Sequence, residues 1–256
     1  MSNQINFSDA WEFYPCNIND KPHSVRFDTA VARLEESEKK QYPHTIELLI
    51  PYIESTENGF PAPSDKERMN RIEDGFYGGD YTVRHIGVIT GGDCSRFVFC
   101  CDGTDEDMGH IIKTLMGENR DIKFRHRVFM NDHFGYYENM LAPSLYENNW
   151  IWNRNVCTNL EKSGEAFKEP RDVDFFCYFA STQHIQDVSD KLCGQGFREL
   201  DRGKTEHEEY SLHMVLECIP TFDSMNGITR GILDLLKETD GIFDGWGSPI
   251  LKDKEI

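Results

Sequence analysis

The stretch RHIGVITGGDCSRFVFCCDGTDED, residues 84–107, decides how the first half of the chain folds. Two apolar runs, 82–90 and 95–101, flank the triplet Gly91-Gly92-Asp93. Glycine readily adopts the positive φ angles that a tight hairpin turn requires. The pattern therefore predicts a β-hairpin that turns at this triplet.

A helix is expected directly after the hairpin, over residues 105–116, where apolar residues recur at helical spacing. Thr104 is the predicted N-cap, and the acidic run Asp105–Asp107 would then lie at the positive end of the helix dipole. A calcium-binding loop that begins at Asp102 is excluded, because its twelfth position, which needs glutamate, is Lys113. The acidic run is therefore explained without a ligand.

The same stretch lacks the patterns of phosphate and zinc sites. Its Gly-Gly turn joins two strands and carries no lysine, unlike a phosphate-binding loop. Cys100 and Cys101 are neighbours in a strand, so their side chains point to opposite faces of the sheet and cannot easily chelate one ion. We therefore expect this stretch to have a structural role. We also expect the protein to bind no metal ion and no cofactor.

Periodicity along the rest of the chain predicts an α+β fold. In the first half it indicates strands at 10–18, 24–32, 44–53 and 122–130, a helix at 64–75 capped by Ser64, and one more strand at 134–140. In the second half it indicates strands at 172–180, 197–201, 211–219 and 242–246, and helices at 183–193 and 223–238. Each half thus contains the series βαββαβ, which predicts two tandem ferredoxin-like modules, the first with an added N-terminal hairpin. The expected domains are 8–146 and 171–251, joined by a polar linker at 147–170 with at most one short helix.

Two predicted strands are apolar on both faces. FVFCC (97–101) and DFFCYFA (174–180) do not alternate as strands of a half-exposed sheet should. We therefore expect the second face of each sheet to be covered, either by the other half of the chain or by another subunit.

The charge and the cysteines restrict the classes of partner. The net charge of −18 is spread along the chain and disfavours direct binding to nucleic acid or to an anionic membrane. It favours a basic protein partner, although it could equally serve solubility alone. The first residues resemble no signal peptide and no apolar run is long enough to span a bilayer, so a cytoplasmic location is expected. The eight cysteines are then expected to be free thiols, most of them buried.

A catalytic site is not evident from the motifs. There is no GxSxG nucleophile motif, and the nine histidines are scattered along the chain. Members of a catalytic triad can be distant in sequence, so an enzyme with a site in an interdomain cleft stays open as an alternative. The basic run Arg125-His126-Arg127 is expected to be a solvated strand face.

Two resemblances emerge from the ordered motifs. WEFYP, VRFD, RIEDGF, HIGVITGGDCSRFVFCCDG and FGYYENMLAP, between Trp11 and Pro143, together resemble the DUF695 family. The segment from Asp172 to Ile250, which ends in FDGWGSPI, resembles the family of regulator of ribonuclease E activity B. The first resemblance implies a small α+β domain of unknown role and supplies no catalytic residues.

The second resemblance implies a non-catalytic protein that binds an endoribonuclease of the ribonuclease E type and inhibits or modulates it. The expected partner is accordingly a ribonuclease or another basic protein. The terminal motif of this family corresponds here to Asp244, Gly245 and Trp246, which are candidate protein-binding residues. The residues themselves favour a structural role for Trp246 in the core. An immunity-type protein that neutralises a basic toxin is the second alternative.

Overall fold

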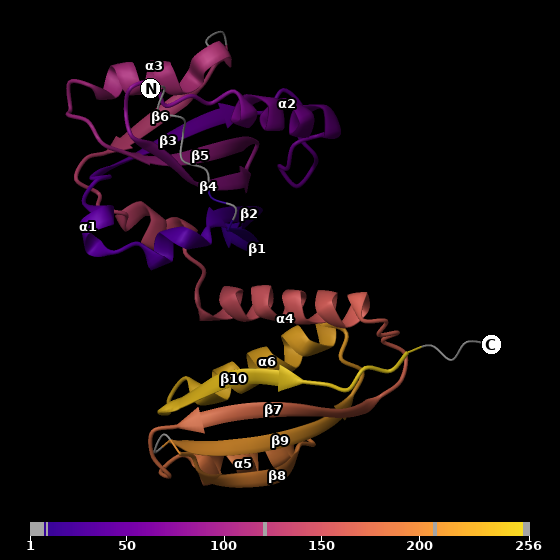
Figure 1. The fold of residues 1–256 in the computed structure, drawn as a ribbon. Coiled ribbons are helices and arrows are strands. Elements are labelled where there is room, and N and C mark those ends of the chain that lie inside the picture. Colours follow the sequence, from indigo (N-terminus) through magenta and orange to yellow (C-terminus); the bar gives the residue numbers. More distant parts are fainter. Residues whose placement is uncertain (1–7, 9, 120–121, 207–208, 253–256) are drawn as a thin grey trace. The chain divides into compact units, whose positions relative to one another are not determined.

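The computed structural model describes residues 8, 10–119, 122–206 and 209–252. The chain divides into two compact units, Met1–Pro143 and Ser144–Ile256. Each unit contains its own antiparallel sheet and its own helices (Figure 1). The prediction of a mixed fold with two sheets is confirmed. Among the described residues, no helix is both long enough and apolar enough to cross a membrane.

The N-terminal unit is built on a six-stranded sheet in the order β1-β2-β4-β5-β3-β6. Its strands are β1 (Trp11–Ile18), β2 (Lys21–Asp28), β3 (His44–Pro51), β4 (Val83–Gly91), β5 (Cys94–Cys101) and β6 (Arg125–Phe129). Its α-helices are α1 (Glu36–Lys39), α2 (Pro63–Asp74) and α3 (Met108–Met116). All neighbouring strands are antiparallel, and the hairpin β1–β2 joins the sheet through β2 and β4.

The segment at residues 84–101 forms the β-hairpin that was predicted from Gly91 and Gly92. Gly91 pairs with Cys94, and the two turn residues Gly92 and Asp93 have φ angles of 61° and 67°. Successive side chains of β5 point to opposite faces, so Cys101 lies in the core under the helices while Cys100 lies near Arg84. Cys100 and Cys101 therefore lie on opposite faces of the sheet, as expected.

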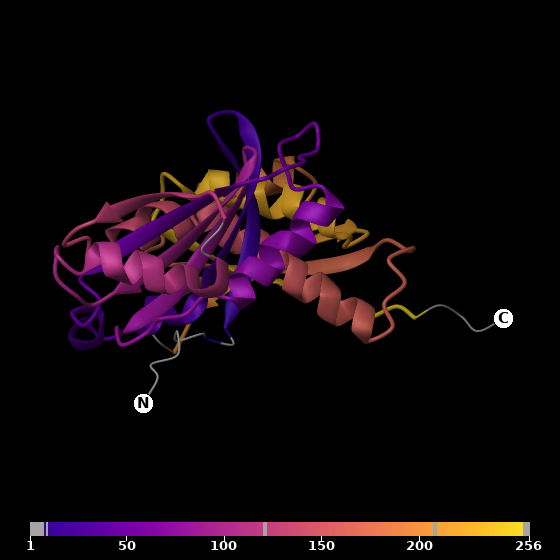
Figure 2. The ribbon, with the colours of Figure 1, turned by 90° about the horizontal axis from the view of Figure 1, so that it is seen from above.

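Helices α2 and α3 cover one face of the sheet, and Figure 2 shows both of them lying across the strands. Buried apolar side chains from β3, β5 and α3 meet there: Ile46, Leu48, Phe97, Phe99, Ile111 and Leu115. Burial of such side chains contributes about 1.5–3 kcal/mol each, so this layer accounts for much of the stability of the unit.

The second face of this sheet is covered by the unit's own chain. Residues 134–140 were expected to form a strand, but the structure has a single π-helical turn at Tyr137–Leu141. Leu141 is fully buried over Gly87, where any Cβ atom would lie 2.5 Å from the leucine side chain. The hydroxyl groups of Tyr137 and Tyr14 donate hydrogen bonds to the carbonyl oxygens of Asp28 (2.9 Å) and Leu141 (3.1 Å). The face is thus buried, but neither the other half nor another subunit is needed to cover it.

The helix starts differ from the predicted caps. Helix α2 begins at Pro63 with Ala62 as N-cap, because proline suits the first helical position, where no N–H bond is lost. Helix α3 begins at Met108, and the carboxylate of Asp107 accepts hydrogen bonds from the backbone N and the hydroxyl of Thr104. Ser64 and Thr104 are therefore not the N-caps.

Asp65, in the first turn of α2, holds the preceding loop to the helix. Its buried carboxylate accepts hydrogen bonds from the backbone N–H groups of Ile53 (2.9 Å) and Glu54 (2.6 Å) and from Arg68 (2.6 Å). Burial alone would raise the pKa of Asp65, but the hydrogen bonds and the charge of Arg68 outweigh it and lower the pKa below 3.8.

We expect Asp65→Asn to lower the free energy of unfolding at pH 7 by about 1–3 kcal/mol. A depressed pKa stabilises the fold above the unfolded-state pKa, and this contribution is lost as the pH falls through the folded-state pKa. The difference between the native protein and the variant should therefore shrink below pH 3.8. Urea unfolding at a series of pH values measures it, with the exposed Glu67→Gln on the same helix as control. A difference that is constant with pH would contradict the assignment.

The C-terminal unit has a four-stranded antiparallel sheet in the order β10-β7-β9-β8. Its strands are β7 (Arg171–Phe179), β8 (Arg198–Lys204), β9 (Tyr210–Cys218) and β10 (Gly241–Gly247). Its helices are α4 (Leu145–Lys162), α5 (Ile185–Gly194) and α6 (Phe222–Leu236). All six elements predicted between 172 and 246 are present. The predicted short strand at 197–201 is longer, because β8 continues to Lys204.

The segment expected to be a linker is largely helical. Helix α4 has 18 residues and starts with a capping box, in which Ser144 and Glu147 bond each other's backbone N–H groups. The side chain of Cys157 on α4 belongs to the core of the C-terminal unit. Residues 145–162 are therefore part of that unit, because one face of α4 is buried on its other elements.

The sheet of the C-terminal unit has two different faces. Val173, Phe175, Cys177 and Phe179 of β7 are buried beneath the helices, whereas the residues between them are half-buried or exposed. No element among the described residues of this unit covers the second face (Figure 1). The expectation of a covered second face is therefore not met within the unit.

Candidate protein-binding site

The motif Asp244-Gly245-Trp246 lies within β10 and contains a β-bulge. The pairing of β10 with β7 shifts register between Phe243 and Gly245, which leaves Asp244 as the extra residue. Gly245 has a φ of 141°, and a Cβ atom there would lie 2.5 Å from the ring of Trp152. Glycine is therefore required here both by the backbone and by the close approach of α4.

Trp246 of β10 joins this strand to α4 through a buried hydrogen bond. Only 4% of its surface is exposed, and its indole Nε1 donates a 2.8 Å hydrogen bond to Oδ1 of Asn153 on α4. The amide of the fully buried Asn153 donates in turn to Thr229 and Asn226 of α6, both at 2.9 Å. The polar groups of this buried network satisfy one another, which makes the packing of β10, α4 and α6 specific.

A groove of about 190 Å³ runs between α4, α6 and β10. We call it the DGWG groove, and it is lined by Leu145, Asn148, Asn149, Trp152, Leu233, Phe243, Asp244 and Gly245. Two large apolar side chains that line it are exposed to solvent, Leu145 over 62% and Trp152 over 43% of its surface. The carboxylate of Asp244 is exposed beside them. The groove therefore offers an aromatic and aliphatic surface with one negative charge, a combination suited to an apolar side chain with a basic neighbour.

The sequence motif marks only half of this site. Asp244 and Gly245 line the groove, whereas Trp246 lies beneath it. Trp152 was missed because it lies in the segment interpreted as a linker, and Leu145 because it lies at the end of the first predicted domain, just before that segment. The Ser144–Glu147 capping box was the available signal, because it marks the start of a helix that brings both residues to one side.

The open sheet face of the same unit carries paired charges. Arg198 bonds Asp172 at 2.7 Å, and His213 bonds Asp174 at 2.7 Å while its ring stacks on Phe176 at 4.6 Å. These groups already have partners within the sheet.

Several histidine and cysteine side chains of the N-terminal unit are buried, and His85 is the most enclosed of these histidines. His85 is fully buried, and its ring stacks on that of Phe99 with 4.8 Å between the ring centres. Its Nδ1 lies 3.6 Å from Oε1 of Glu73. Burial first, and then the charge of Arg26, lowers the pKa of His85 to about 3, so its ring is neutral at pH 7. A neutral, enclosed imidazole of this kind is suited to packing.

The eight cysteines are free thiols, as expected. Burial raises the pKa of Cys157 to about 11 and those of Cys177 and Cys101 to about 12, the last with help from Asp102. These thiols are protonated at neutral pH, unlike the low-pKa cysteines that act as nucleophiles. Among the described residues, no three His, Cys, Asp or Glu side chains are grouped to hold a metal ion.

Comparison with known proteins yields two family matches. The model of DUF695, a family of unknown function, matches residues 9–142, just over half of the chain. The model of Regulator of ribonuclease activity B matches residues 150–248. No curated protein matches the chain.

Among solved structures, one that is similar is described as a putative glycine cleavage system transcriptional repressor. It is 7% identical with a TM-score of 0.24, and the match covers 80% of this chain and 98% of that one. A similarity this low carries no inference about fold or function.

Proposed function

The chain belongs to the DUF695 family and continues into a segment that matches Regulator of ribonuclease activity B, and from this premise we propose that it is a non-catalytic protein that binds and regulates an endoribonuclease of the ribonuclease E type. The C-terminal unit is the binding module, and the DGWG groove is its contact surface. Trp246 contributes indirectly, by holding α4 and Trp152 in place.

The observation that carries this proposal is the exposure of Trp152 and Leu145 beside Asp244. Tryptophan is enriched among the few residues that dominate binding energy at protein interfaces. Here its ring rests on Gly245 and belongs to a helix fixed by buried hydrogen bonds, so little side-chain and backbone entropy would be lost on binding.

The charge of the chain supports a basic partner. A net charge of −18 speeds the approach of a basic surface, and the effect weakens as salt screens it. Asp244 would then pair with a lysine or arginine at the rim of the contact, where such pairs set the association rate more than the affinity.

We further propose that both units are ferredoxin-like modules. The series β7-α5-β8-β9-α6-β10, with sheet order β10-β7-β9-β8, supports this for the C-terminal unit. The series β3-α2-β4-β5-α3-β6, with order β4-β5-β3-β6, supports it for the N-terminal unit, to which β1 and β2 are added. The domain boundary proposed here falls between Pro143 and Ser144, ahead of α4, in place of a linker at 147–170.

The binding surface is tested with Trp152→Ala in the full-length protein. We expect it to weaken binding to a purified ribonuclease E-type enzyme by at least about tenfold, since tryptophan is enriched among the interface residues whose truncation costs about 2 kcal/mol or more. Calorimetry at low and high salt measures the affinity, and Asp244→Asn should reduce its salt dependence. Ile53→Ala, which removes an exposed apolar side chain of the N-terminal unit, is the matched control.

Two results would overturn this function. One is a native protein that neither binds nor slows any host ribonuclease at low salt. The other is recovery of a basic toxin by affinity purification from the host, which would instead support an immunity function. Unchanged affinity in Trp152→Ala would show that the partner binds at a surface other than the DGWG groove.

A further inference from the structure

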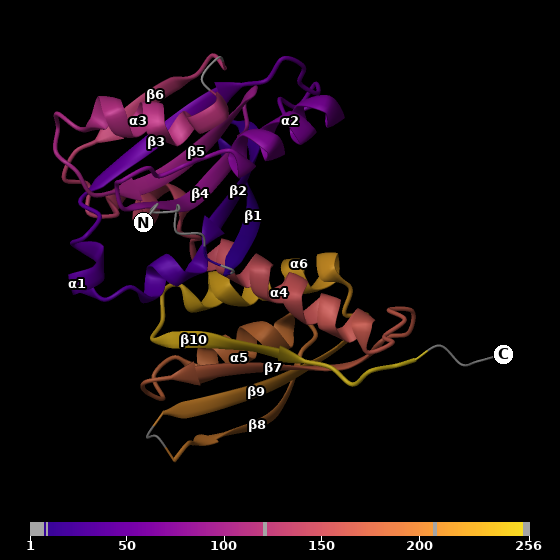
Figure 3. The same cartoon turned by 45° about the horizontal axis from the view of Figure 1, so that its top comes forward.

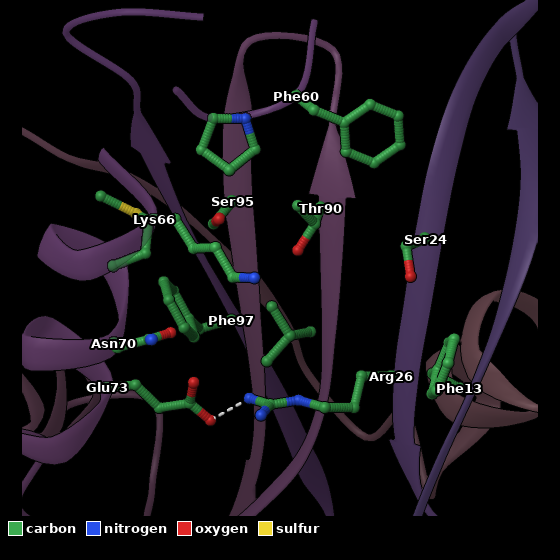
Figure 4. Close-up of a pocket in the computed structure, with 13 residues that line it drawn as sticks. Phe13, Ser24, Arg26, Phe60, Lys66, Asn70, Glu73, Thr90, Ser95 and Phe97 are labelled. Carbon is green, nitrogen blue, oxygen red and sulfur yellow. Dashed lines mark hydrogen bonds and ion pairs between the residues drawn. The ribbon is translucent and has the colours of Figure 1, made fainter. Parts of the chain in front are cut away.

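A second pocket lies wholly within the N-terminal unit and is independent of the proposed function. It has a volume of about 440 Å³, within the size range of small-molecule sites. Its walls come from the hairpin β1–β2, from α2 and from the loop at Phe60 and Pro61, and its floor comes from β4 and β5 (Figure 4). We call it the hairpin pocket.

The architecture of the sheet explains why this pocket exists. Helix α2 packs over the middle of the sheet, whereas β1 and β2 extend the same sheet beyond β4 (Figure 3). Ser24 and Arg26 on β2 pair with Thr90 and Val88 on β4, so all four side chains point to the helix side. A trough is left there between α2 and the added hairpin.

The floor of the hairpin pocket is apolar and its edge is polar. Phe97 and Val88 on the floor and Met69 on the α2 wall are themselves almost completely buried. Hydroxyl groups of Ser24, Thr90 and Ser95 lie along it, and the Ser95 hydroxyl also bonds that of Tyr52 at 3.1 Å. Such a site can hold an apolar body and at the same time hydrogen-bond a polar group.

The cations of the pocket differ in what they already bind. Arg26 forms an ion pair with Glu73, drawn as a dashed line in Figure 4, and its guanidinium lies 5.1 Å from the centre of the Trp11 ring. Lys66 extends from α2 into the pocket, and no acidic side chain of the described chain lies within ion-pair distance of it. The pocket thus has an uncompensated positive charge in a chain whose net charge is −18.

We propose that the hairpin pocket binds a small organic monocarboxylate with an apolar body. The carboxylate lies against the Lys66 ammonium and the hydroxyls of Thr90 and Ser95, and the apolar body lies on Phe97 and Val88. A single ammonium with hydroxyl donors suits a monoanion. A phosphate group would call for further charged or backbone donors, whereas Arg26 is already engaged by Glu73.

The test uses 3-phenylpropionate as probe, titrated into the labelled full-length protein and followed by NMR. We expect saturable binding with a dissociation constant below about 1 mM. Neutral 3-phenylpropanamide and acetate, which each lack one half of the recognised chemistry, should bind at least about tenfold more weakly.

Lys66→Met keeps an unbranched side chain one atom shorter and removes the charge at an exposed helix position, so the fold is preserved. It should weaken 3-phenylpropionate binding at least about tenfold, whereas Lys113→Met on α3 of the same unit should not change it. Absence of binding, equal binding of the amide or of acetate, or an unchanged affinity in Lys66→Met would each overturn the proposal. Binding at least about tenfold tighter by a peptide that ends in phenylalanine would overturn it as well, since the occupant would then be a chain end.

Discussion

Replacing Arg84 with methionine is expected to lower the free energy of unfolding of the N-terminal unit by about 3–5 kcal/mol. Arg84 donates from Nε (3.0 Å) and Nη2 (2.6 Å) to Asp28, whose side chain is completely buried. Without the arginine, the carboxylate of Asp28 would be left as an unpaired charge in a site closed to water. That cost is much larger than the net contribution of the intact pair.

The position of Asp28 magnifies the effect. Its carboxylate also accepts the backbone N–H of Ala30 (2.8 Å), and its carbonyl oxygen accepts the Tyr137 hydroxyl. Movement of Asp28 would therefore loosen the segment that covers the second face of the sheet. Hydrogen exchange should show the loss of protection around Tyr137 first.

Denaturant unfolding together with hydrogen exchange resolved along the chain measures the Arg84→Met effect for the N-terminal unit alone. The exposed Arg71→Met on α2 is the control and should change stability by less than about 0.5 kcal/mol. The double variant Asp28→Leu/Arg84→Met should regain part of the loss, because it removes both charges. A loss below about 1 kcal/mol in Arg84→Met would contradict the role assigned to the pair.

Replacing Trp246 with alanine is expected to destabilise the C-terminal unit by about 3–5 kcal/mol, the usual cost of removing a buried tryptophan ring. The substitution also removes the indole N–H that donates to Oδ1 of Asn153, a residue with no exposed surface. Because this bond joins β10 to α4, the amides of α4 should lose protection from exchange before those of β7 and β9 do.

Trp246→Phe separates the two contributions, because it keeps an aromatic ring and loses the indole donor. Its expected cost is about 1–3 kcal/mol, the penalty for a buried acceptor left unsatisfied. Trp150→Phe, at a half-buried position of α4, is the control. If α4 kept full protection in Trp246→Ala, the motif would not be what holds this helix.

The local sequence pattern, meaning turn residues and apolar periodicity, was sufficient to predict most of the secondary structure. The hairpin at Gly92 and Asp93 was predictable because a two-residue turn requires positive φ angles, which depend only on neighbouring residues. The strands and helices between 172 and 246 were predictable because their apolar periodicity is maintained over whole elements. The predicted strand at 134–140 failed because aromatic residues there serve as a lid on Gly87, and that role is visible only in three dimensions.

The candidate sites were harder to predict than the fold. The terminal motif pointed to Asp244 and Gly245 but could not supply Trp152, whose ring reaches Gly245 from a helix more than ninety residues earlier. In the sequence, Lys66 is a single charged residue on a helix, and nothing in the local pattern distinguishes it from other surface lysines. Glu73, the acidic residue that lines the same pocket, is paired instead with Arg26 of the hairpin β1–β2, and this pairing joins segments that are distant in sequence.

The sequence by itself determined the α+β character, the two families, the free thiols and the acidic surface, because these follow from composition, short-range periodicity and motif order. Only the tertiary structure decided that residues 145–162 belong to a core, that the chain covers its own sheet in the N-terminal unit, and that Lys66 faces a pocket. The physical reason is that burial and pairing depend on contacts between distant segments. Local periodicity shows which face of an element is apolar, but not what will lie against it.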